Sequence, residues 1–241
     1  MKPNLRDSET DAVEGQAMGH HHGRKRERAI DRACPTSIHL VRSLSPGATV
    51  ADVGCHGWSL GDASLASGAD YVGVDRVEPP GRPAHARFAG CSNGILDLPD
   101  DSCDLVVAGH VLEHVPAPVE LMTELLRIAK PGGLVWIESP SELACQTVGS
   151  SDPEDHTFLS FWDDPTHVRP WTPGALYRLA ITCQALPIAM QRGESGGIPV
   201  TTMLALKPEH VRSRPATRYV TLKDVAHGLE AAYDAVWGRR S

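Results

Sequence analysis

Short apolar runs alternate with stretches of helical periodicity along most of the chain. Buried strands are predicted where the apolar runs occur, at 48–53, 71–74, 87–89, 104–108 and 134–137. Helices are predicted where apolar residues recur every three or four positions, at 29–44, 59–67, 118–129 and 172–183. Strands and helices that alternate in this order build a parallel sheet with helices on both faces.

Local signals mark several of the expected boundaries. The segment Lys130-Pro-Gly-Gly133 is expected to end one helix and turn into the next strand. Thr172 can cap the last helix of the pattern, since Pro173 fits its first turn. Two more strands, 186–192 and 199–207, are predicted to pair antiparallel. The expected fold is therefore α/β, a doubly wound, seven-stranded, mostly parallel sheet with an antiparallel C-terminal strand.

The remaining segments lack this pattern. Residues 1–28 are polar and are expected to form a flexible arm, while 29–209 form one domain. Within that domain, 139–171 have no periodicity and are expected to be a functional loop on the substrate side. The extension 210–241 carries an amphipathic helix at 222–237, which packs on the domain or forms a homodimer contact.

Composition narrows the class of protein. The chain has 241 residues and a formal net charge of −7, which argues against a large nucleic-acid footprint and tolerates a cationic substrate. Its six cysteines form no Cys-x-x-Cys pair, so free thiols in a reducing cytoplasm are expected. No apolar run has the length of a signal peptide or a membrane span, so no membrane partner is expected.

The most informative pattern surrounds the first two strands. Gly54 follows the first strand, and Asp75 ends the second after one intervening helix. This spacing places a carboxylate where it can hold a ribose at the tip of the second strand. A nucleoside-containing cofactor is therefore the first hypothesis, and a dehydrogenase-like protein remains open on this motif alone.

Downstream segments narrow that hypothesis. The motifs are Val50-Ala-Asp-Val-Gly-Cys55, the segment Leu98-Pro-Asp-Asp-Ser-Cys-Asp-Leu-Val-Val107 with Val111-Leu-Glu-His-Val115, and Arg127-Ile-Ala-Lys-Pro-Gly-Gly-Leu134. In this order the chain resembles the class I S-adenosylmethionine-dependent methyltransferases, in the group that methylates small molecules. The resemblance covers about 36–207. It implies a Rossmann-like fold, methyltransferase activity and S-adenosyl-L-methionine as the cofactor.

The resemblance also implies a set of cofactor contacts. Asp52 and Gly54 would lie at the methionine end, Asp75 at the ribose, and 93–95 beside the adenine. The complete expected set is Asp52, Gly54, Cys55, Gly57, Asp75, Arg76, Asn93, Gly94, Ile95, Gly109 and His110.

Two departures from the family pattern concern this set. His56 and Trp58 stand where the family usually has glycines, so either Gly57 takes over the backbone role or the loop is remodelled. Gly94 stands where a carboxylate often contacts the adenine, and Asn93 or a backbone carbonyl would replace it.

The irregular segment 139–171 combines acidic and aromatic residues at the carboxyl edge of the sheet. Such a mixture suits a cation or polyamine, because carboxylates pair with ammonium groups and ring faces attract them. A solvated acidic loop is the alternative. The expected substrate contacts are His114, Glu138, Asp155, Trp162, Asp164, His167 and Arg169.

Three histidines are candidates for chemistry. His167 is the expected general base, because an unperturbed imidazole titrates near neutral pH, although it could instead tie the loop to the sheet. His110 is expected next to the reacting methyl group, as a residue that positions the nucleophile or as a polar loop residue. His114 is expected to be mainly structural. No metal site is expected, and His20-His21-His22 lie on the arm without a preformed geometry.

These interpretations converge on a bacterial O- or N-methyltransferase of specialised metabolism, acting on an amino sugar or aminoglycoside in antibiotic biosynthesis. Abundant glycine, alanine, arginine and proline with few lysines suggest a GC-rich bacterial source. One alternative is a protein or nucleic-acid methyltransferase, although no Asn-Pro-Pro-aromatic segment follows the fourth strand. Another is a non-catalytic scaffold with a degenerate glycine loop.

Overall fold

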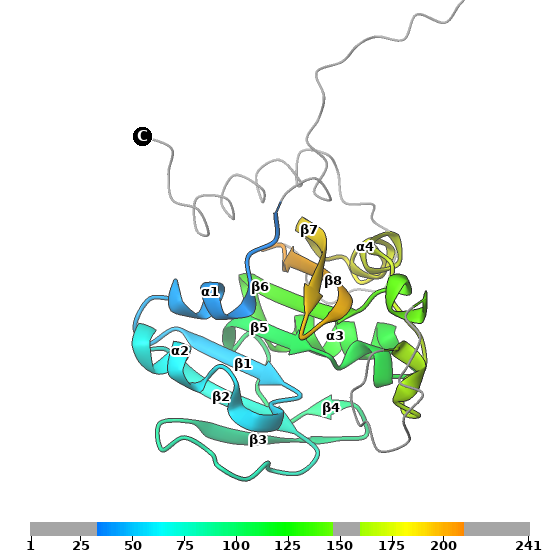
Figure 1. Cartoon of the computed structure of the whole chain (residues 1–241). Helices are drawn as coiled ribbons and strands as arrows, with labels where there is room; N and C mark the ends of the chain where they lie inside the picture. The colour runs from blue at the N-terminus through cyan, green and yellow to red at the C-terminus, as the bar shows by residue number, and fades with distance from the viewer. Residues whose placement is uncertain (1–32, 147–159, 210–241) are drawn as a thin grey trace, which may run out of the picture.

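The computed structural model describes residues 33–146 and 160–209, which form one mixed sheet with helices packed against it (Figure 1). The predictions for the N-terminal arm, for the helix 222–237 and for Asp155 fall outside the described residues. Among the described residues, no helix combines the length and the apolar character that crossing a membrane requires.

A single sheet of eight strands runs through the described part of the chain in the order β4-β3-β2-β1-β5-β6-β8-β7. The strands are β1 Thr49–Val53, β2 Asp70–Asp75, β3 Arg87–Ser92, β4 Ile95–Leu96, β5 Cys103–Gly109, β6 Ala129–Pro140, β7 Leu186–Ser195 and β8 Ile198–Leu206. Strands β3, β2, β1, β5 and β6 run parallel to one another. Strand β4 pairs antiparallel with β3, and β8 pairs antiparallel with both β6 and β7. Strand order reverses at β1, between β2 and β5, and ligands of open α/β sheets bind at the carboxyl ends of such strands.

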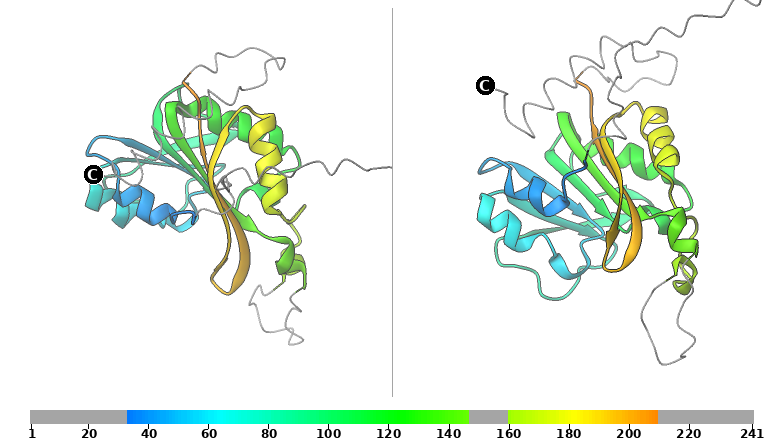
Figure 2. Two further views of the ribbon diagram at one scale, coloured as in Figure 1. Left: turned by 90° about the horizontal axis from the view of Figure 1, so that it is seen from above. Right: turned by 45° about the horizontal axis from the view of Figure 1, so that its top comes forward.

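Helices cover both faces of the sheet, as Figure 2 shows from two sides. The helices are α1 Ser37–Arg42, α2 Gly61–Ser67, α3 Pro118–Ile128 and α4 Pro173–Thr182. Short 3-10 turns are η2 His56–Trp58, η3 Leu112–His114, η4 Glu142–Gln146 and η5 Phe161–Asp163. Because side chains alternate along a strand, Tyr71 joins the core under α1 and α2, while Val72 joins the core under α3 and α4.

The first helix is shorter than predicted. Periodicity predicts a helix over 29–44, but among the described residues it begins only at Ser37, where the Thr36 side chain caps it by accepting from His39 N. The preceding residues cross the sheet: Cys34 N donates to Gln191 Oε1 at 3.0 Å, and Pro35 O accepts from Trp136 Nε1 at 2.9 Å. These tertiary hydrogen bonds replace the first helical turns.

The sheet has one strand more than predicted, and two strands are longer. The two-residue strand β4 was not predicted, and β3 continues to Ser92 rather than ending near 89. Strand β6 begins at Ala129, directly after α3, so the strand starts before the predicted turn at 130–133. The turn is present as an irregularity in the strand, since the pairing register shifts between Ala129 and Leu134 and Gly132 has φ of +77°. Lys207 N donates to Gly133 O at 2.9 Å, and Lys207 O accepts from Gly132 N at 2.8 Å.

Other predictions are confirmed. Strands β7 and β8 pair antiparallel, with Ser195 opposite Ile198 across the Gly196-Gly197 turn. The Thr172 side chain caps α4 by accepting from Ala175 N, with Pro173 in the first turn. All six cysteines are free thiols.

Candidate active site at the carboxyl edge of the sheet

The turn after β1 brings the backbone close to the next elements. Gly54 has φ of +78°, and a Cβ there would lie 2.5 Å from Val111 Cγ2, so only glycine fits. Its N–H donates to Val74 O at 2.8 Å, which fixes the turn against β2. Gly57 has φ of +79° with no heavy atom within 4 Å of a Cβ built there. Gly57 therefore supplies an open, left-handed position in the loop, as one of the two sequence alternatives predicts.

Trp58 is part of the core, despite standing at a glycine position of the family motif. It is 5% exposed, and its Nε1 donates to Pro79 O at 3.2 Å. Its ring lies over Gly73 of β2, where a Cβ would come within 2.3 Å of Cζ3. Trp58 is thus accommodated by packing, because its ring fills the space over Gly73, which has no side chain.

Asp52 lies beneath this turn and is buried. The Tyr71 hydroxyl donates to Asp52 Oδ2 at 2.7 Å. Burial raises the pKa of Asp52 to about 6; the hydrogen bond from Tyr71 opposes this shift, and the nearby Asp75 carboxylate adds to it. In this structure the partner of the Asp52 carboxylate is the Tyr71 hydroxyl. The contact of Asp52 with the cofactor stays a prediction.

A cavity of about 480 Å³ opens beside the end of β2. Its lining residues are Arg76, Gly90, Cys91, Ser92, Ile95, Leu96, Asp97, Leu98 and Arg127. Arg76 N donates to Asp75 Oδ1 at 2.7 Å, which connects the predicted ribose carboxylate to the cavity wall. Asn93 and Gly94 form the β3–β4 turn, both with positive φ. Of the residues expected at the ribose and at the adenine, Arg76 and Ile95 therefore line the cavity, whereas Asp75, Asn93 and Gly94 are next to lining residues in the chain.

A charged cluster lies at the ends of β5 and β6. His110 Nδ1 is 3.3 Å from Glu113 Oε1, and His110 Nε2 is 3.5 Å from Glu138 Oε1. Contacts with Glu113 and then Glu138 raise the pKa of His110 to about 9, although burial opposes this. Burial works against ionisation of Glu138, but its contacts with His110 leave its pKa lowered. His110 is therefore an imidazolium at neutral pH and does not accept a proton there.

Glu113 is the member of this cluster that the sequence interpretation missed. It is completely buried, and its Oε2 accepts from Ser139 Oγ at 2.8 Å. A carboxylate three residues after His110, in the turn that follows a strand, was the available signal.

A second group of histidines lies on the other side of Glu113. His167 Nδ1 is 2.6 Å from Phe161 O, and His114 Nδ1 is 2.8 Å from Thr166 Oγ1. The two imidazole rings have centroids 4.7 Å apart. Val168 N donates to Glu113 O at 2.7 Å, which ties this segment to η3.

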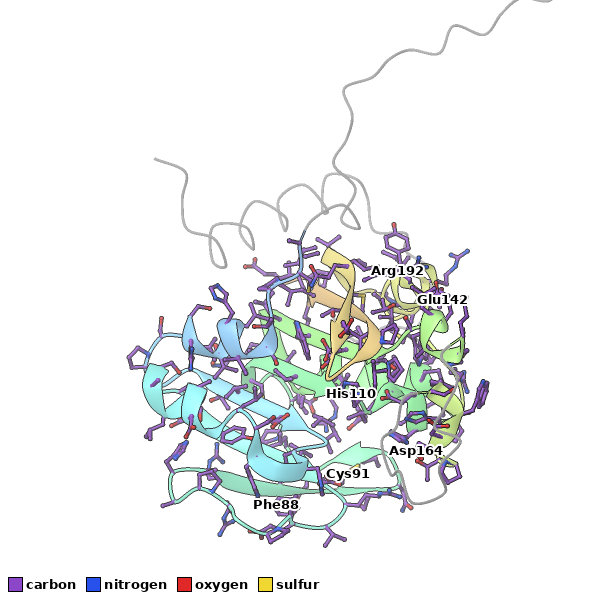
Figure 3. The ribbon with its side chains drawn as sticks, viewed as in Figure 1. Phe88, Cys91, His110, Glu142, Asp164 and Arg192 are labelled. Atoms are coloured by element: carbon purple, nitrogen blue, oxygen red, sulfur yellow. The ribbon has the colours of Figure 1, made fainter. Side chains whose placement is uncertain are left out.

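The structure separates the predicted catalytic and substrate residues into two sets. His110, His114 and His167 lie around Glu113, Glu138 is 3.5 Å from His110, and Asp164 is 3.8 Å from His167. Trp162 is 61% exposed, and Arg169 Nη2 donates to Pro116 O at 2.7 Å. Figure 3 shows where His110 and Asp164 lie on the ribbon, together with the ion pair of Arg192 and Glu142, which the sequence interpretation did not include.

The glycine turn, the carboxylate at the end of β2 and the cavity lie at the carboxyl ends of neighbouring parallel strands, where open α/β sheets have their ligand crevice. The model of a methyltransferase-domain family matches residues 20–181, and the chain belongs to this family.

Curated relatives come from mycobacteria. An uncharacterised methyltransferase of Mycobacterium ulcerans is 40% identical over 105 residues, covering 38% of this chain and 41% of that protein. One from Mycobacteroides abscessus is 33% identical over 138 residues, covering 46% of this chain and 52% of that protein. The chain thus matches about half the length, or less, of these relatives.

Solved structures share the fold. A SAM-dependent methyltransferase of Methanosarcina mazei superposes with a TM-score of 0.55 at 16% identity, covering 73% of this chain and 99% of that chain. The 1,6-didemethyltoxoflavin-N1-methyltransferase of Burkholderia thailandensis superposes with a TM-score of 0.53 at 21% sequence identity. The match covers 71% of this chain and 79% of that chain. Family and fold confirm the prediction of a class I S-adenosylmethionine-dependent methyltransferase.

Proposed function

We propose that this protein transfers a methyl group from S-adenosylmethionine to a small molecule whose acceptor is a cationic amine. The observation that carries the cofactor part is the continuity of the Gly54 turn, Asp75 and the cavity at the ends of adjacent parallel strands. The cofactor would lie along this line, with its ribose at Asp75 and its base towards Ile95.

S-adenosylmethionine, when bound, supplies an electrophilic methyl group on a sulfonium. The chain has to bind the acceptor, orient it and keep water out. At the acceptor end of the crevice, the carboxylates of Glu113 and Glu138 lie on either side of His110. Carboxylates at this end favour an ammonium acceptor over a carboxylate acceptor.

An ammonium acceptor has to lose a proton before methylation. His110 is charged at neutral pH, so it orients groups rather than removing protons. In the neutral imidazole of His167, Nδ1 donates to the Phe161 carbonyl, which leaves Nε2 as a proton acceptor. His167 therefore remains the proposed general base.

The small-molecule class is supported by likeness in fold. The Burkholderia enzyme is named for N1-methylation of 1,6-didemethyltoxoflavin, and its structure contains that compound and S-adenosylhomocysteine. The acidic balance of the chain also disfavours a nucleic-acid acceptor. We extend the proposal to an amino sugar or aminoglycoside of bacterial specialised metabolism.

Titration calorimetry with S-adenosylmethionine tests the cofactor part. We expect Asp75→Ala to weaken binding by roughly 10- to 100-fold, the loss of about 1.5–3 kcal/mol for hydrogen bonds to a charged group. The matched control is Asp70→Ala, at the exposed amino end of the same strand, which should leave affinity unchanged. Equal affinities for the two variants would contradict the ribose assignment.

The acceptor part is tested with labelled cofactor and a panel of amino sugars, phenols and carboxylic acids. We expect label in the amino sugars, with less transfer by His167→Ala. Labelling of the phenols alone would overturn the amine proposal while leaving the cofactor assignment intact.

A further inference from the structure

The side chains of Glu113, His114 and His167 converge from η3 and from the segment that precedes α4. One ring nitrogen from each histidine and one Glu113 carboxylate oxygen lie within 4.8 Å of one another. We propose that these three residues bind a divalent transition-metal ion of the Zn²⁺ or Mn²⁺ type. The sequence interpretation expected no metal site.

Hydrogen bonds orient both imidazole rings for such a role. The Phe161 carbonyl can only accept, so His167 Nδ1 donates to it, and in the neutral ring Nε2 keeps its lone pair. A bound ion would take this lone pair, so the ion-bound protein could not use His167 as the base of the proposed function. Metal-binding histidines usually donate their second ring N–H in this way, which fixes the tautomer.

The same reasoning applies to His114. Asp164 Oδ1 accepts from the Thr166 hydroxyl at 2.6 Å, which uses the only proton of that hydroxyl. Thr166 Oγ1 therefore accepts from His114 Nδ1, 2.8 Å away. His114 Nε2 is thus also left with a free lone pair in the neutral ring.

The carboxylate of Glu113 supplies the independent observation. Glu113 is completely buried, and among residues 33–146 and 160–209 its Oε1 has no aligned hydrogen-bond donor. Oε1 forms an ion pair with His110, 3.3 Å from Nδ1, but this contact lacks hydrogen-bond alignment. The imidazolium offsets the charge of the carboxylate, and a bound metal ion would use the Oε1 lone pairs that no aligned donor occupies.

The ligand atoms indicate the class of ion. Two imidazoles with one carboxylate suit zinc, manganese, iron or cobalt, whereas Ca²⁺ and Mg²⁺ prefer oxygen ligands alone. Asp164 Oδ2 lies 3.8 Å from His167 Nε2 and can provide a fourth ligand. The ion would join η3 to the segment 160–169 next to the acceptor end of the crevice.

Metal stoichiometry in the full-length chain tests the proposal. His20-His21-His22 could bind metal themselves, so the background protein carries alanine at these three positions. Titration calorimetry with Zn²⁺ and Mn²⁺, together with the visible absorption of bound Co²⁺, should show one ion per chain. Binding of less than a tenth of an equivalent would overturn the proposal without reference to methylation.

Variants locate the site. The double variant His114→Ala/His167→Ala should lose the ion, while His39→Ala, an exposed histidine of α1, should retain it. Thr166→Val removes only the acceptor for His114 Nδ1 and should weaken binding by roughly 10- to 100-fold. Because Thr166 is exposed, this variant tests the site even if the double variant fails to fold. Unchanged affinity in Thr166→Val or in a folded double variant would place the ion elsewhere.

Discussion

The β1–β2 side and the β5–β6 side of the ligand crevice are built in different ways. On the β1–β2 side, the unusual residue Trp58 is absorbed into the core and carries no charge. On the β5–β6 side, Glu113, Glu138, His110, His114 and His167 lie in contact with one another or with shared partners. The first side is held together by apolar packing and the second by charged contacts, and the departure from the glycine motif at Trp58 is a packing feature.

The physical basis of this difference is the cost of burial. An aromatic ring can enter a core wherever a neighbour gives up volume, and Gly73 does so for Trp58. A carboxylate enters only with partners, since an unpaired buried charge is expensive. The β1–β2 side is therefore tested by changes in packing and the β5–β6 side by changes in charge.

The largest expected effect concerns Trp58. Replacing it with alanine should lower the free energy of unfolding by about 3–5 kcal/mol, as for other buried aromatic residues. Denaturant unfolding followed by circular dichroism measures this loss.

A double-mutant cycle tests whether Trp58 and Gly73 are coupled through packing. Gly73→Ala alone should be strongly destabilising, because its Cβ would meet the Trp58 ring at 2.3 Å and Cys55 Sγ at 2.7 Å. Combined with Trp58→Ala, the same change should cost less, a coupling of about 0.5–3 kcal/mol. Additive losses would mean that the two positions are independent and that the comparison fails on this side.

The next effect is the pH dependence that Asp52 gives to stability. Its pKa is raised from 3.8 to about 6 in the folded protein, so the folded state binds the proton more tightly than the unfolded chain. Stability from this group is present at low pH and is lost as pH rises through about 6. The loss should reach about 2–3 kcal/mol, at 1.36 kcal/mol per unit of pKa.

Asp52→Asn isolates this contribution, since the amide does not titrate. The difference in unfolding free energy between the native protein and the variant should move in favour of the variant as pH rises from 4 to 7, in steps that bracket the pKa of about 6. A difference that stays constant over this range would show that Asp52 is solvated, and the β1–β2 side would then share the charged character of the other side.

These contrasts also explain what could be predicted from the sequence. The alternation of elements, the Thr172 cap and the Gly54 turn have local signals, and the structure confirms them. Strand β4 and the early start of β6 depend on pairing with distant residues, such as Lys207 with Gly132 and Gly133, which no local pattern reveals. Glu113 appears in sequence as one charge in an apolar turn, and its role emerges only when His110, at φ of 53°, turns back towards it.

The smallest effect concerns His110, and it tests the charged side directly. The pKa of His110 is raised from 6.5 to about 9, so any stability that it contributes is fully present below pH 6.5 and is lost as pH rises through 9. Because the side chain is half exposed, solvent screens this contribution, and the titration itself is the better measurement. Nitrogen-15 NMR of the imidazole should show His110 still protonated at pH 8, and Glu138→Gln should lower its pKa by removing one of the two carboxylates. The exposed His39 provides an internal reference in the same spectra. If His110 were neutral at pH 7, it would be available as a base, and the assignment of proton removal to His167 would lose its main support.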